Sequence, residues 1–102
     1  MITITPAELT LVQNILREKI PNARIWVFGS RAKGTARRGS DLDLAIDAGA
    51  PLPHSITGPL ADALENAPLP YTVDLVDLHT TNPTFTALID AEKIPLPGFE
   101  QD

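Results

Sequence analysis

Two aspartates separated by one residue, Asp41 and Asp43, open an apolar run and carry the clearest chemical signal in the chain. If the run is a β-strand, alternate side chains point to opposite faces, so both carboxylates project to the same face. Two carboxylates held side by side repel each other unless a cation lies between them. Because hard divalent ions prefer oxygen ligands, the pair predicts a Mg²⁺ site.

A glycine and a serine, Gly29 and Ser30, end another apolar run, and ten residues separate them from Asp41. A small turn at the end of a strand lets backbone amides and a hydroxyl approach an anion closely, and a helix starting there adds its positive end. Half of the eight basic residues lie in the same loop: Arg31, Lys33, Arg37 and Arg38. The arrangement favours a polyphosphate held beside its metal, although a merely solvated basic loop would have the same composition.

A further carboxylate is expected from residues 71–78, with the sequence YTVDLVDL. Alternation along a strand places Asp74 on one face and Asp77 on the other, so only one of them can join Asp41 and Asp43. The pattern alone leaves the choice open.

Length, charge and cysteine content limit the kinds of protein that this chain can be. The chain has 102 residues, a net charge of −5 and no cysteine, which predicts one domain over residues 1–102 and excludes disulfides and thiolate metal sites. No apolar stretch approaches the roughly 20 residues of a membrane span, and we expect a cytoplasmic protein without a membrane segment. A local basic loop in an acidic chain suits a polyphosphate better than a long nucleic acid, so direct nucleic-acid binding is not expected.

The elements that would position these residues follow from periodicity and from turn residues. Thr5 and Pro6 are typical of a helix start, and Asn82 and Pro83 open another helix. We expect Trp26 in the core. The pattern predicts helices over residues 6–20, 31–35, 60–66 and 84–92, strands over 23–28, 42–46 and 71–78, a proline-rich loop over 49–59 and an extended tail over 93–102.

The sequence also predicts the positions of several individual side chains. Ser55 is expected to cap the helix over 60–66, and His54 to lie exposed in the loop before it. Phe85, Leu88 and Ile89 are expected to be the apolar contacts of the last helix. Three strands with helices before, between and after them predict an α/β (α+β) two-layer domain.

The whole pattern, GSRAKGTARRGSDLDLAID, resembles the signature of the polymerase-beta-like nucleotidyltransferases and especially of their minimal (MNT) branch. The resemblance implies a short mixed sheet of about three strands that carries the carboxylates at one end. It implies ATP as substrate, two Mg²⁺ ions and transfer of AMP to an acceptor hydroxyl. By the same resemblance, Asp41, Asp43 and Asp74 are the catalytic and metal-binding residues, whereas Gly29, Ser30 and Arg31 bind the nucleotide.

The resemblance also suggests a partner. Like-sized relatives pair with a helical HEPN-type toxin, and the nucleotidyltransferase acts as antitoxin by adenylylating a tyrosine of that toxin. Two alternatives stay open: an antitoxin that neutralises by contact alone, and the catalytic subunit of a small-molecule nucleotidyltransferase. A core this small with an exposed apolar helix face also predicts a homodimer or a hetero-oligomer.

Overall fold

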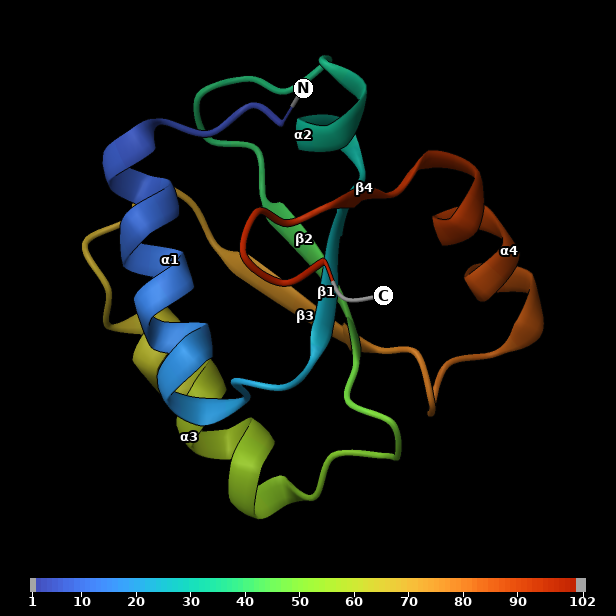
Figure 1. The fold of residues 1–102 in the computed structure, drawn as a ribbon. Helices are drawn as coiled ribbons and strands as arrows, with labels where there is room; N and C mark the ends of the chain where they lie inside the picture. Colours follow the sequence, from blue (N-terminus) through green and yellow to red (C-terminus); the bar gives the residue numbers. More distant parts are fainter. Residues whose placement is uncertain (1, 101–102) are drawn as a thin grey trace.

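A mixed sheet with helices on both of its faces forms the structure, a computed structural model that describes residues 2–100 (Figure 1). Helices α1 and α3 cover one face, and α4 packs on the other. The elements in chain order are α1 (Pro6–Lys19), β1 (Arg24–Phe28), α2 (Ser30–Lys33), β2 (Leu42–Asp47), α3 (His54–Glu65), β3 (Val73–Asp77), α4 (Pro83–Glu92) and β4 (Ile94–Pro95).

The strand order is β3-β2-β1-β4. Strands β1 and β2 are antiparallel, and β2 and β3 are parallel. A parallel pair needs a long crossover connection, which α3 supplies. The expected mixed sheet with its helices is therefore confirmed, although it has four strands instead of three.

The fourth strand lies where the sequence predicted an extended tail. Ile94 and Pro95 pair with β1, and the chain then turns back so that Leu96 and Phe99 are fully buried. The Leu96 N–H donates to the Ile25 carbonyl, and the Ile25 N–H donates to the Phe99 carbonyl. The expectation was wrong because the prolines here limit the strand's length without keeping the apolar side chains out of the core.

Helix α1 begins and ends as predicted. The Thr5 hydroxyl accepts from the Glu8 N–H, and the Glu8 carboxylate accepts from the Thr5 N–H, which is a complete capping box. Helix α3 corrects a prediction, because it begins at His54, not at Leu60. Pro53 is its N-cap, so Ser55 lies inside the helix and does not cap it.

A proline inside α3 explains the late start that the sequence predicted. Pro59 removes one backbone hydrogen bond, which normally argues against a helix. Leu60 and Leu64 are almost completely buried on this helix, and Ile56 packs against the same cluster. The apolar contacts therefore hold a helix that local propensity alone disfavours.

Each face of the sheet has its own apolar cluster. Leu44 and Ile46 of β2 face α1 and α3, whereas Phe28 and Ala45 face α4 through Ile89. Two residues that were expected to be buried, Trp26 and Leu88, are not part of the buried core. The indole of Trp26 is only half-buried, between the side chains of Arg24 and Lys93, and Leu88 is 55% exposed. Trp26 shares its face with α4, but the short α4 does not extend over it.

Within residues 2–100, no helix combines the length and the apolar character that crossing a membrane requires.

Replacing Leu44 by alanine should lower the free energy of unfolding by about 2–5 kcal/mol, because it opens a cavity in the middle of the sheet. The exposed Leu88 provides the matched control, and Leu88→Ala should change it by less than about 0.5 kcal/mol. Urea denaturation measures both values. Equal effects of the two changes would contradict this assignment of the core.

Candidate active site

Asp43 and Asp74 are direct neighbours across the parallel strands β2 and β3. Neighbouring strands lie roughly 4.8 Å apart, and paired residues point to the same face of a sheet. Asp41 comes immediately before β2, and its side chain lies close enough to that of Asp74 to raise the pKa of Asp74. The fold thus brings the three aspartates together at one end of the face that α4 partly covers.

Burial and the nearby negative charges change the acidity of two of these carboxylates, Asp43 and Asp74. The pKa of Asp43 is raised above its usual value by burial first, and then by the negative charges of Asp74, Asp41 and Glu92. The pKa of Asp74 is raised by desolvation, by the charge of Asp41 and by the hydrogen bond to it. The protein alone therefore holds this cluster against electrostatic repulsion, which a divalent cation would relieve.

The donor set suits a metal that is shared with a substrate. In residues 2–100, no three histidine, cysteine, aspartate or glutamate side chains form a complete group that could hold a metal ion. Mg²⁺ usually keeps several waters and takes only one or two carboxylates together with substrate phosphates. Asp41 and Asp43 fit that mode of binding, with oxygen donors only and no closed protein cage.

The turn at Gly29 and Ser30, which the sequence predicts to bind phosphate and which we call the phosphate turn, lies directly against Asp43. Gly29 has φ 74° and ψ −158°, a conformation that is essentially restricted to glycine. A Cβ atom at this position would overlap the Oδ2 atom of Asp43. Helix α2 is a single turn, so any attraction for an anion comes from individual amides and the Ser30 hydroxyl, not from a long helix dipole.

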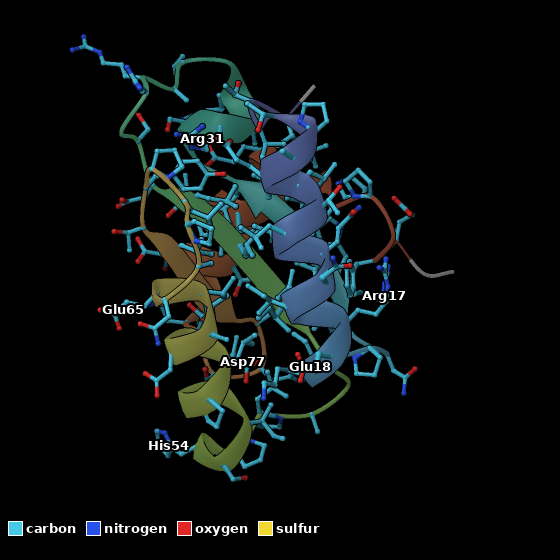
Figure 2. The ribbon with its side chains drawn as sticks, turned by 90° about the vertical axis from the view of Figure 1, so that its left-hand side faces the viewer. Arg17, Glu18, Arg31, His54, Glu65 and Asp77 are labelled. Atoms are coloured by element: carbon cyan, nitrogen blue, oxygen red, sulfur yellow. The ribbon has the colours of Figure 1, made fainter. Side chains whose placement is uncertain are left out.

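Arg31 is buried, with 4% of its surface exposed. Its guanidinium donates to the backbone carbonyls of Thr3, Arg37, Arg38 and Ser40 and lies 4.0 Å from the ring centroid of Tyr71. Figure 2 labels Arg31 at α2, in the upper part of the view. This geometry fits a residue that shapes the loop, and the direct nucleotide contact expected for Arg31 stays a prediction.

Asp77 lies apart from the carboxylate cluster. Its Oδ2 accepts from the Leu52 N–H at 2.8 Å, and its Oδ1 accepts from the His79 N–H at 2.9 Å. Figure 2 shows Asp77 far from Arg31, toward the opposite end of the molecule. The structure therefore places Asp74, and not Asp77, beside Asp43.

Neither histidine lies in the carboxylate cluster. The His79 Nε2 is 2.6 Å from the Asp47 Oδ1, at the far end of β2. His54 is exposed as expected, but it is the first residue of α3 instead of a loop residue.

Glu92 is a residue that sequence reasoning missed. Its Oε1 accepts from the Gly29 N–H at 2.8 Å, and its Oε2 lies 3.4 Å from the Lys33 Nζ. Glu92 ends α4, 63 residues after Gly29, and a lone glutamate at a helix end gives no signal of such a contact.

Comparison with known proteins gives consistent results. A family model described as polymerase beta, nucleotidyltransferase, matches residues 11–98. The chain is 42% identical over 86 residues to a probable protein adenylyltransferase MntA of Haemophilus influenzae, covering 84% of this chain and 75% of that protein. It is 36% identical over 89 residues to the protein adenylyltransferase MntA of Shewanella oneidensis, covering 86% of this chain and 63% of that protein.

Solved structures are similar over most of the chain. A toxin-antitoxin crystal structure with AMP-PNP has a TM-score of 0.76 and 34% identity, over 92% of this chain and 76% of that one. A complex of a tri-AMPylated Shewanella oneidensis HEPN toxin with an MNT antitoxin has a TM-score of 0.59 and 26% identity, over 86% of this chain and 67% of that one.

Replacing Gly29 by alanine should destabilise the fold by about 1–3 kcal/mol, because alanine is strained at this φ and its Cβ meets Asp43. Gly39→Ala is the control, since that glycine lies in the same loop with open space around its Cβ position and without a positive φ. Chemical denaturation measures both variants. A Gly29→Ala protein as stable as Gly39→Ala would contradict the close approach.

Replacing Asp43 by asparagine should stabilise the metal-free protein at about pH 7. A carboxylate whose folded pKa is raised above 3.8 contributes its full stability below 3.8, and this contribution is lost as pH rises through the folded pKa. The advantage of Asp43→Asn should therefore shrink as pH falls to about 3. Urea denaturation in chelator measures it, with the exposed Asp62→Asn as control. An advantage independent of pH would contradict the raised pKa.

Proposed function

This chain belongs to the polymerase beta nucleotidyltransferase family, and from that premise we propose that it transfers AMP from ATP to a tyrosine hydroxyl of a HEPN-type toxin. Two relatives named protein adenylyltransferase support the choice of reaction. The AMPylated HEPN toxin found in complex with a similar antitoxin supports the choice of acceptor. The observation that carries the proposal is the pairing of Asp43 with Asp74 beside the phosphate turn.

In this proposal, the phosphate turn and the carboxylates bind different parts of the substrate. The Ser30 hydroxyl and the first amides of α2 bind the β- and γ-phosphates, as backbone groups at such turns do in other proteins. Asp41 and Asp43 would hold Mg²⁺, and Asp74 would help hold a second ion or act as a base. The bound metal would offset the charge of the triphosphate and steady the oxygens that enter and leave. Lys33 lies at the end of the same helical turn and adds positive charge to the rim.

The transfer itself is an in-line displacement. The tyrosine oxygen forms a bond to the α-phosphorus while the bond from that phosphorus to the pyrophosphate oxygen breaks. Asp74 accepts the proton of the tyrosine when it acts as base. The products are a tyrosine carrying AMP and free pyrophosphate.

The surroundings of Asp74 suit a residue on the acceptor side. Asp74 is exposed on β3, which is an edge strand of the sheet. Asp43, in contrast, is partly buried against Gly29. The nucleotide would therefore lie toward β1 and the acceptor toward β3.

The test is transfer to a purified HEPN-type partner in the presence of Mg²⁺ and ATP labelled at the α-phosphate. We expect the label on the partner, and Asp74→Asn should slow transfer by about 10²–10⁴-fold if it acts as base. Asp43→Asn should abolish transfer, whereas Asp62→Asn on the outside of α3 should not affect it. Mass spectrometry of the partner locates the modified residue.

No transfer by a fully folded chain under these conditions would contradict the proposal. Neutralisation of the toxin that survives Asp41→Asn and Asp43→Asn would instead favour an antitoxin that acts by contact alone. Label that appears on an aminoglycoside or another small hydroxyl compound, and not on the partner, would identify a small-molecule nucleotidyltransferase.

A further inference from the structure

Glu92 connects α4 to both ends of the helical turn that follows β1. One carboxylate oxygen accepts from the N–H of Gly29, which caps α2, and the other faces the ammonium group of Lys33, which ends α2. The Glu92 side chain is only 17% exposed, whereas that of Lys33 is 53% exposed. The carboxylate therefore meets the Gly29 amide in a partly dehydrated setting, where a charge-assisted hydrogen bond is strong.

The position of Glu92 is fixed from both sides along the chain. Before it, Ile89 and Phe85 pack against Phe28 at the end of β1, with the two phenyl rings 5.9 Å apart. After it, Ile94 pairs with Val27 of β1. Figure 1 shows α4 leading directly into β4 alongside β1. The glutamate is thus presented to the turn by packed structure on either side of it.

The turn needs such support. Gly29 has a backbone conformation that persists only when the surrounding structure imposes it. Asp43 is close enough to clash with any Cβ at this position, so the turn lies between two carboxylates. The bond from Glu92 uses the N–H of Gly29 itself and leaves the N–H and hydroxyl of Ser30 available to a ligand.

We propose that Glu92 is a positioning residue for nucleotide binding: it fixes the Gly29 turn and holds Lys33 beside it, so that Ser30 meets the triphosphate in a preformed geometry. The inference rests on the proposed function, because it assigns the phosphates to this turn. Glu92 acts through Gly29 and Lys33 and does not touch the substrate.

Three variants test the assignment. Glu92→Ala should weaken ATP binding about tenfold, the effect expected when one charge-assisted hydrogen bond is lost. Glu92→Gln should recover most of that loss, since its amide oxygen can still accept from the Gly29 N–H. Asp90→Asn, an exposed carboxylate on the same helix, should leave ATP affinity unchanged. Calorimetry measures affinity without the acceptor, and in the transfer reaction the change should appear in KM for ATP more than in kcat.

Two results would overturn the inference. Tighter ATP binding by Glu92→Ala would show that the carboxylate competes with the phosphates for the turn. Equal losses of ATP affinity in Glu92→Ala and Glu92→Gln would show that the hydrogen bond from the Gly29 N–H does not position the turn.

A nucleotide-free measurement separates this inference from the proposed function. Hydrogen exchange of the Gly29 amide, followed by NMR, should be slow in the wild type and in Glu92→Gln and fast in Glu92→Ala. If the wild type binds ATP but transfers nothing to the partner, the proposed reaction fails while the positioning role stands. Fast exchange in the wild type would overturn the positioning role even if transfer proceeds.

Discussion

The repulsion among carboxylates at the end of β2 and β3 is the constraint on which the rest of the structure depends. Asp43 and Asp74 are held side by side because their strands are parallel and in this register. Apolar packing on the opposite face of the sheet offsets this repulsion. Leu42, Leu44 and Leu75 pack into the main core there. A slip of one residue would turn Asp74 toward the helices and an apolar side chain toward the site, so core packing and site geometry are fixed together.

The sequence predicted those parts of the fold whose cause is local. The start of α1 at Thr5 and Pro6 and the start of α4 at Asn82 and Pro83 depend on residues within a few positions of each helix. The residue pattern also indicated that only one of Asp74 and Asp77 could join Asp43. That distinction follows from the alternation of side chains along a strand, which does not depend on the rest of the protein.

What the sequence could not predict depends on contacts between distant segments. The two-residue strand β4 exists because β1 has a free edge there, and the turn that follows it is fixed by hydrogen bonds with Ile25. Helix α3 continues through Pro59 because its buried leucines meet the core. Leu88 and Ile89 are equally apolar in sequence, and only the direction of α4 decides that Ile89 is buried.

The charged residues of the candidate site show the same limit. Composition grouped Arg31 with the other basic residues of this loop, and the structure adds that its buried guanidinium donates to backbone carbonyls of the loop after α2. Arg37 and Arg38 remain exposed on that loop. The loop therefore separates its basic residues into one that maintains its shape and others that face solvent, a division that residue type cannot reveal.

The acidic cluster and a triphosphate are both negatively charged, so each would repel the other. The protein alone keeps carboxylates close together, and the pKa values of Asp43 and Asp74 are raised by burial first and then by the neighbouring negative charges. A free triphosphate approaching the same face would add further negative charge beside them. A divalent ion between the two relieves both repulsions at once, so in the proposed reaction the nucleotide binds together with its metal. In the proposed reaction, the carboxylates that repel one another in the metal-free protein would therefore be the groups that bind the nucleotide together with its metal.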